Sequence, residues 1–224
     1  VLLTRYFFNM PNYKKFIIDT LQEAGSVAKA AFIKPKKITA KKDNSLVTET
    51  DLAIDEFVRE KIKKNFPEHN IITEENDEIK QGSKFTWICD PIDGTLNFAR
   101  GLPLFGPMLS LAVDDQTHFA GVFDSMHNEL MYGQKGGGAF LNGKKLKQVS
   151  DIQLEKAIVV MSGYTSYWNE GEAKLDQVLS KKINIRGSSL SAINETLWVV
   201  SGRMHALTFA GAFTWDIAPI SCFG

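Results

Sequence analysis

The feature that most constrains the fold is an apolar segment, residues 85–95, that ends in two carboxylates, a glycine and a hydroxyl. Its first five residues are rich in aromatic and branched side chains, which predicts a strand buried on at least one face. The strand is expected to stop at Asp90, because Pro91 has no N–H with which to continue the hydrogen-bond ladder. Asp90 and Asp93 are therefore expected where a strand ends.

The chemistry of this segment suits a metal and a phosphate group. Asp90 and Asp93 offer only oxygen ligands, which favours a hard cation such as Mg2+ over zinc. Gly94 is followed by Thr95, a possible helix N-cap, and free backbone N–H groups at a helix start favour a bound anion. The alternative is an ordinary polar turn, because Asp-Pro and Asp-Gly are common turn dipeptides.

The composition narrows the class of protein. With 224 residues, of which 44% are hydrophobic and 23% charged, the chain is expected to form one or two closely packed globular domains. Lys+Arg and Asp+Glu both number 26, so no overall field favours nucleic acid or an acidic membrane. Two cysteines do not make a disulfide framework, and a cytoplasmic setting is the default expectation. The apolar residues 1–8 are too short to span a bilayer.

Further acids lie upstream of this segment. Asp51 is at the start of a helix predicted over 48–66, where it would serve as an N-cap. A short strand at 71–72 runs into Glu74 and Glu75, so a second strand also ends in acids. Carboxylates from two strand ends repel one another unless a cation lies between them, so their convergence would itself indicate a metal.

Other elements of the first 150 residues follow from periodicity. Apolar residues at helical spacing after Asn12 predict a long amphipathic helix over 13–32. The basic stretches 34–37 and 41–45 are expected to form a solvated loop, with a lid over an anionic substrate as the alternative. A period near two between 109 and 146, with intervening turn residues, predicts an antiparallel meander.

The residues beyond 150 mix both periodicities. Strands are predicted at 157–161, 183–185 and 204–209, and a helix near 172–179. A further helix over 188–201 has Ser188 or Ser189 as its cap, and Asp216 would cap the last helix. These patterns predict a mixed α/β fold.

Four segments carry a resemblance to a known family. They are 46–51 (Leu-Val-Thr-Glu-Thr-Asp), 73–75 (Thr-Glu-Glu), 87–98 (Trp-Ile-Cys-Asp-Pro-Ile-Asp-Gly-Thr-Leu-Asn-Phe) and 215–219 (Trp-Asp-Ile-Ala-Pro). In this order they closely resemble the motifs of the inositol monophosphatase family of Mg2+-dependent, lithium-sensitive phosphatases. The resemblance implies a layered αβαβα sandwich of the sugar-phosphatase type, with mixed sheets, and a homodimer. An N-terminal half, 1–150, would carry most metal ligands, and a C-terminal half, 151–224, would contribute the rest.

The resemblance also implies a role for each motif residue. Glu74, Asp90 and the Ile92 carbonyl would bind a first Mg2+, and Asp90, Asp93 and Asp216 a second, with Glu74 sharing a third ion. Asp51 and Thr95 would orient the attacking water, and the Gly94 and Thr95 amides would hold the phosphate. The substrate would contact Asp93, Asp216 and serines among Ser188, Ser189 and Ser191.

The chain departs from the resemblance in three places. Phe209 stands where members acting on inositol phosphates usually have an acidic residue, which leaves the substrate open. The spacing to Gly202 is longer than usual, so either Ser188 and Ser189 or Ser191 could be the substrate contact. The chain ends at Gly224, where family members continue, so a truncated chain is expected.

The function expected from these residues is a Mg2+-dependent phosphomonoesterase that acts on a small sugar or polyol phosphate resembling inositol 1-phosphate. Alternative substrates are fructose 1,6-bisphosphate, histidinol phosphate and 3'-phosphoadenosine 5'-phosphate, whose base could stack on Tyr164, Tyr167 or Trp168. A non-catalytic regulatory or assembly subunit is the alternative from another class.

Overall fold

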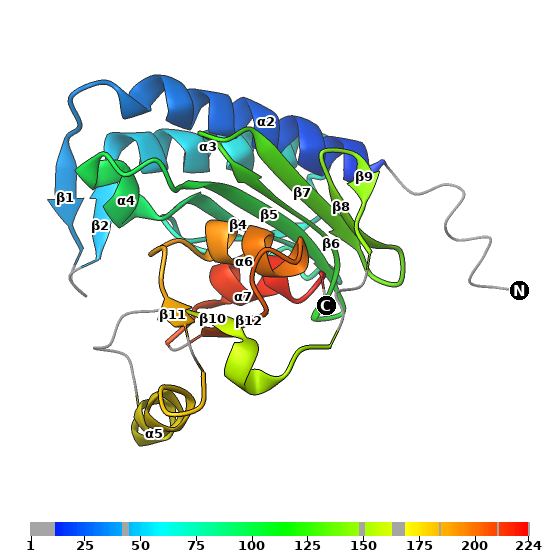
Figure 1. Ribbon diagram of the computed structural model, residues 1–224. Helices are drawn as coiled ribbons and strands as arrows, with labels where there is room; N and C mark the ends of the chain where they lie inside the picture. Colours follow the sequence, from blue (N-terminus) through cyan, green and yellow to red (C-terminus); the bar gives the residue numbers. More distant parts are fainter. Residues whose placement is uncertain are drawn as a thin grey trace, which may run out of the picture.

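The computed structural model describes residues 12–41, 45–147, 151–162, 169–183, 185–209 and 211–223. Helices and sheets alternate in layers (Figure 1): α2 and α3 cover one face of a large sheet, α6 and α7 lie on the other, and a small sheet separates them from α5. These helices are α2 (Tyr13–Phe32), α3 (Glu49–Asn65), α5 (Glu170–Leu179), α6 (Ala192–Val200) and α7 (Thr214–Ile220). The predicted αβαβα sandwich is confirmed. In the described part of the chain, no helix is long and apolar enough to cross a membrane.

The large sheet has seven strands in the order β3-β4-β5-β6-β7-β8-β9. β3 and β4 are parallel, and every later pair is antiparallel, which confirms the predicted meander. The strands are β3 (Asn70–Thr73), β4 (Phe85–Asp93), β5 (Gly106–Val113), β6 (Gln116–Asp124), β7 (Glu129–Gln134), β8 (Gly138–Leu141) and β9 (Lys144–Lys145).

Strand β4 is longer than predicted, so the expectation that Pro91 ends it is wrong. Asp90 pairs with Met108 and Asp93 with Gly106, so three steps on β4 match two on β5 across a bulge. A residue at a bulge need not donate to the ladder, which is why the proline is accepted there. Side chains alternate between faces along a strand, so the extra residue also puts Asp90 and Asp93 on the same face of the sheet.

The core beneath β4 forms between the sheet and the two long helices. Asn12 caps α2, because its Oδ1 accepts the Lys15 N–H at 2.9 Å. Trp87 is fully buried, and its ring centroid lies 6.0 Å from that of Tyr13 on α2. This packing holds β4, and hence the acids at its end, on a rigid support.

The segment predicted as a basic loop includes the first strand of a β-hairpin and leads into the second. β1 (Ile38–Ala40) pairs antiparallel with β2 (Leu46–Thr48), and residues 42–44 between them lie outside the described part of the chain. The β-branched residues Ile38 and Thr39 favour a strand, but the lysines on either side of them favour a solvated loop. The alternative of a lid remains a prediction.

The small sheet consists of three parallel strands in the order β11-β10-β12. They are β10 (Ile158–Ser162), β11 (Ile185–Gly187) and β12 (Ala206–Phe209), and a 3-10 turn, η1 (Leu154–Lys156), precedes β10. The strand predicted at 183–185 therefore lies two residues later. The predicted boundary at 150 falls between the two sheets and remains a prediction.

Helix α6 begins at Ala192, with Ser191 as its N-cap. The expectation that Ser188 or Ser189 caps this helix is wrong. Leu190 has a φ of 58°, in the left-handed region, and a right-handed helix cannot run through that conformation. The residues before Ser191 form a separate turn.

Candidate active site

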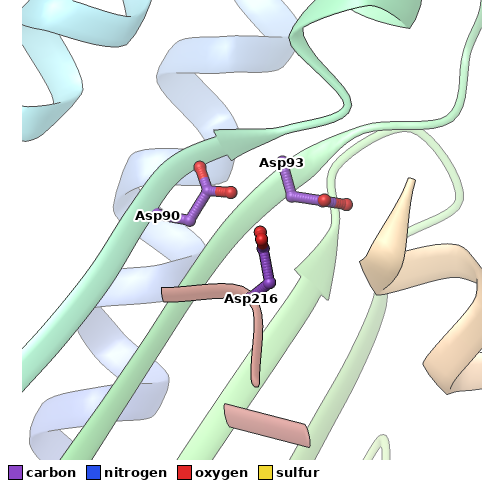
Figure 2. Close-up of side chains that lie close together, drawn as sticks. All are labelled: Asp90, Asp93 and Asp216. Carbon is purple, nitrogen blue, oxygen red and sulfur yellow. The ribbon is translucent and has the colours of Figure 1, made fainter. Parts of the chain in front are cut away.

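Three carboxylates from distant parts of the chain meet at the end of β4. Asp90 and Asp93 come from β4 and Asp216 from the first turn of α7, and one oxygen of each lies within 4.8 Å of the others. Figure 2 shows the three side chains close together, with the Asp216 carboxylate between those of Asp90 and Asp93. The bulge in β4 places Asp90 and Asp93 on one face of the sheet, and helix α7 on that side of the sheet carries Asp216.

The electrostatics of this acidic cluster call for a positive charge. Burial raises the pKa of Asp90 well above its usual range, and Glu74, Asp93 and Asp216 raise it further. Burial also raises the pKa of Asp93 to about 7 and that of Asp216 to about 6. Buried like charges are stable together only when they are protonated or share a cation.

The donor set fits a divalent cation. Asp90 Oδ1 is buried and has no hydrogen-bond partner among the described residues. Unpartnered buried carboxylate oxygens are costly, whereas hard cations such as Mg2+ prefer such ligands. The residues implied by the motifs are therefore chemically able to hold the metal.

Glu74 lies beside this cluster but has a partner of its own. Its backbone N–H donates to the carbonyl of Cys89 at 3.2 Å, which places the end of β3 next to β4. Lys41 of the β1–β2 hairpin holds Glu74 Oε1 and Glu75 Oε1, each at 2.8 Å from its Nζ. Burial lowers the pKa of Lys41, but the two glutamates raise it more, so the ammonium stays charged.

Asp51 and Thr95 are in contact, as the motifs implied. Thr95 Oγ1 lies 3.0 Å from Asp51 Oδ1 and 2.9 Å from the carbonyl oxygen of Ile92, so its single proton can be donated to either. Burial raises the pKa of Asp51 to about 6. A buried carboxylate with a pKa near neutrality can accept a proton passed through a hydroxyl.

Three predicted helix caps are corrected by the structure. Asp51 is the third residue of α3, and Thr48, whose N–H donates to Asp51 Oδ2 at 2.9 Å, is the N-cap. Asp216 is likewise the third residue of α7 and accepts the N–H of Phe213 at 2.7 Å. Gly94, not Thr95, is the N-cap of α4 (Thr95–Arg100). In each case the residue predicted as the cap lies inside the helix. The sequence pattern of a cap and that of the first turn are alike, and only the backbone geometry distinguishes the two positions.

Gly94 adopts a conformation that glycine favours and is in close contact with its surroundings. Its φ is 80°, and a Cβ at this position would lie 2.7 Å from the carbonyl oxygen of Leu104 and 3.2 Å from Ser191 Cβ. A side chain would be strained there and would collide with backbone. The turn that contains Gly94 is thus packed directly against the start of α6.

The serine segment is next to the acidic cluster, and its hydroxyls are already engaged. Ser191 Oγ donates to Asp93 Oδ2 at 2.6 Å. Ser188 Oγ and Ser189 Oγ each lie 3.1 Å from Glu195 Oε1. The structure therefore brings all three serines close to the predicted site, with Ser191 bonded to it directly.

Several other positions complete the comparison with the sequence. Phe209 is half-buried and packs against a core cluster that includes Met108 and Ile193. The aromatic residues Tyr164, Tyr167 and Trp168 lie outside the described residues. The sequence analysis gave no role to Lys41, Asn97 or Glu195, and the one signal for Glu195 is that it is the only acid in the helix predicted over 188–201.

Comparison with known proteins gives the same answer as the motifs. A model described as "Inositol monophosphatase family" matches residues 10–222. Inositol monophosphatase 3 of Solanum lycopersicum is 31% identical over 212 residues, covering 90% of this chain and 78% of the relative. The Nus factor SuhB of Escherichia coli strain K12 is 30% identical over 214 residues, covering 90% and 77%.

A solved structure shares the fold. The IMPase of Thermotoga maritima superposes with a TM-score of 0.84 and 27% sequence identity, covering 94% of this chain and 81% of that one. The layered fold and these relatives define the class of protein as a phosphatase, a hydrolase of phosphate esters. Within that class, the chain belongs to the inositol monophosphatase family.

Proposed function

We propose that the chain is a Mg2+-dependent phosphomonoesterase of a small sugar or polyol phosphate, with an inositol phosphate as the first substrate to test. The observation that carries this proposal is the acidic cluster of Asp90, Asp93 and Asp216, with oxygens within 4.8 Å of one another. Glu74 and the Ile92 carbonyl would complete the ligands of two to three ions. Bound Mg2+ would supply Lewis acidity, lower the pKa of a water and neutralise the leaving oxygen.

The residues of the chain have separate tasks in this proposal. Thr95 and Asp51 would take the proton of the attacking water, because Thr95 Oγ1 is 3.0 Å from Asp51 Oδ1 and can pass a proton to it. The backbone N–H groups of Gly94 and Thr95 would hold the phosphate. Asp93, Asp216 and the segment Ser188–Ser191 would face the alcohol part of the substrate, with Ser191 also orienting Asp93.

Phosphate release from a panel of esters tests the proposal. The panel is inositol 1-phosphate, fructose 1,6-bisphosphate, histidinol phosphate, glycerol phosphate and 3'-phosphoadenosine 5'-phosphate, each assayed with Mg2+ and with excess chelator. Release that depends on Mg2+ and is fastest with a polyol or sugar phosphate is expected. If no ester were hydrolysed in a metal-dependent way, the proposed activity would be wrong.

A regulatory role is the second candidate, because one relative of similar identity bears the name Nus factor. A regulatory protein that has lost catalytic activity would keep the fold but would not bind Mg2+. Calorimetric titration of the protein with Mg2+ separates the two: saturable binding that Asp90→Asn abolishes supports the enzyme, and no binding supports the regulator. A homodimer and a cytoplasmic location are also proposed, and light scattering of the purified protein tests the dimer.

A further inference from the structure

The turn formed by residues 188–190 stands beside the acidic cluster. It leads directly into Ser191, whose Oγ donates to Asp93 Oδ2 at 2.6 Å, and into Ala192, whose N–H donates to Asp93 Oδ1 at 3.0 Å. Gly94 packs against the same serine, since a Cβ on Gly94 would lie 3.2 Å from Ser191 Cβ. Any displacement of this turn would therefore change the wall of the site next to Asp93.

Asn97 holds the turn from the side of α4. Its side chain is fully buried, and its Nδ2 lies 2.8 Å from the carbonyl oxygens of both Ser189 and Leu104. An amide has two N–H groups, so both bonds can form at once. Asn97 follows Thr95 by two residues, and it thus ties the turn to the helix that starts at the proposed phosphate site.

Glu195 holds the turn from the side of α6. It is fully buried, and its Oε1 accepts the Ser189 N–H at 2.6 Å and lies 3.1 Å from both Ser188 Oγ and Ser189 Oγ. Its other oxygen, Oε2, has no hydrogen-bond partner among the described residues. A buried glutamate with one unpartnered oxygen is unfavourable compared with an apolar residue at the same position of a helix. The stability of the helix therefore does not explain a glutamate at position 195. Its bonds to Ser188 and Ser189, which fix the conformation of the turn, do explain it.

The backbone of the turn is strained, which is consistent with a need for such support. Leu190 has a φ of 58° and is 49% exposed. A branched residue in the left-handed region costs free energy and persists only where the surroundings impose it. Glu195 bonds to Ser188 and Ser189, which directly precede this residue, and Asn97 bonds to the carbonyl oxygen of Ser189.

We infer that Glu195 and Asn97 are positioning residues that fix the turn 188–190 against the acidic cluster, so that the turn contacts the alcohol part of the substrate. This inference rests on the proposed phosphatase activity. Neither residue contacts the cluster itself, so their loss should weaken substrate binding and leave Mg2+ and inorganic phosphate binding unchanged. A purely structural role would instead lower stability without a selective effect on the KM.

Three variants of α6 test the role of Glu195. Glu195→Leu removes all acceptors, Glu195→Gln keeps a carbonyl oxygen for the Ser189 N–H, and Thr196→Val is the matched control, because Thr196 is buried on the same helix with an unpartnered hydroxyl. Each is assayed for kcat, for the KM of the best ester, for inhibition by inorganic phosphate and for calorimetric Mg2+ binding. Hydrogen exchange of the amides of residues 188–191 is measured in the metal-free protein.

For Glu195→Leu we expect the KM to rise about tenfold or more, which corresponds to about 1.4 kcal/mol of substrate binding. The kcat should stay within about threefold of the wild-type value, and the affinities for Mg2+ and inorganic phosphate should not change. Amides of the turn should exchange faster, Glu195→Gln should restore most of the KM, and Thr196→Val should match wild type. An unchanged KM with unchanged exchange would overturn the inference, as would equal losses of Mg2+, phosphate and substrate binding.

The test still gives a clear result if the wild type is inactive or if a variant does not fold. If wild type hydrolysed no ester, the proposed function would fail, and the exchange measurement alone would decide whether Glu195 holds the turn. If Glu195→Leu did not fold, Asn97→Ala would replace it, since it removes the bond to Ser189 from the opposite side. A selective rise in the KM of Asn97→Ala would support the inference, and a wild-type KM would contradict it.

Discussion

Ser191 donates its hydroxyl to Asp93 Oδ2 across 2.6 Å, although 98 residues separate the two in the chain. The backbone N–H groups of Ala192 and Ile193 donate to the same carboxylate at 3.0 and 2.9 Å. Asp93 is thus both a member of the acidic cluster and an acceptor for the first two N–H groups of α6, whose N-cap is Ser191. Asp90, only three residues earlier, has no such second task.

The two aspartates should therefore differ when the metal is absent. Asp93→Ala is expected to destabilise the metal-free protein by about 1–2 kcal/mol, because the Ser191 hydroxyl and the first two N–H groups of α6 lose their acceptor. Asp90→Asn should leave metal-free stability equal or higher, since it replaces a buried carboxyl whose ionised form is unfavourable without a cation. Both should abolish the gain in stability on adding Mg2+. Urea unfolding with and without Mg2+ measures this, and equal metal-free stabilities of the two variants would contradict it.

Activity should depend on the ionisation of Asp51. Burial raises the pKa of Asp51 to about 6, and only its ionised form can accept a proton from Thr95. The value of kcat/KM should therefore fall as the pH drops below about 6, approaching tenfold per pH unit. Bound cations favour the carboxylate, so saturating Mg2+ should move the inflection lower. A pH–rate profile at two Mg2+ concentrations checks this, and an inflection that rises with Mg2+ would contradict it.

Lys41 should compete with the metal. Its ammonium is paired with Glu74 and Glu75, whose side chains are only 18% and 3% exposed. Lys41→Met removes this internal cation, so Mg2+ should bind more tightly, by roughly threefold to tenfold, because like charges near a site oppose cation binding. Calorimetry measures the affinity, and Lys80→Met, whose side chain is 77% exposed, is the control. Weaker Mg2+ binding by Lys41→Met would show that the lysine assists the site.

His69 should make the protein sensitive to acid independently of the metal. Its ring stacks on those of Phe66 and Phe85, and its Nδ1 accepts the indole N–H of Trp87 at 3.1 Å, which requires a neutral imidazole. Burial lowers the pKa of His69 below its usual 6.5. The unfolded chain then binds the proton more readily than the folded one, so stability is lost as the pH falls below about 6.5.

Thermal unfolding at several pH values, followed by tryptophan fluorescence, measures this loss. His69→Phe removes the titrating group, so its stability should depend less on pH between about 5 and 6.5 than that of wild type. An identical pH dependence in the two proteins would assign the acid sensitivity to other groups.

Much of the site could be predicted because its chemistry is local. The residue types of the segment 85–95 indicate oxygen ligands independently of the residues around them. The motifs, which occur in the same order as in the family, imply that Glu74, Asp51 and Asp216 belong to the same site. Helix α2 and the meander follow from periodicity, which also depends on near neighbours. The errors occurred where near neighbours are insufficient: the bulge at Pro91, the caps of α3, α4, α6 and α7, and the strand among lysines at Ile38.

The sequence by itself determined which residue types could bind a metal and which segments would be helix or strand, because side-chain chemistry and periodicity are properties of short stretches. Only the tertiary structure decided that a bulge turns Asp90 and Asp93 to one face and that Ser191 is the serine bonded to Asp93. It also revealed the buried bonds of Glu195 to the turn. These relationships depend on how layers far apart in the chain pack together, and no local pattern encodes that packing.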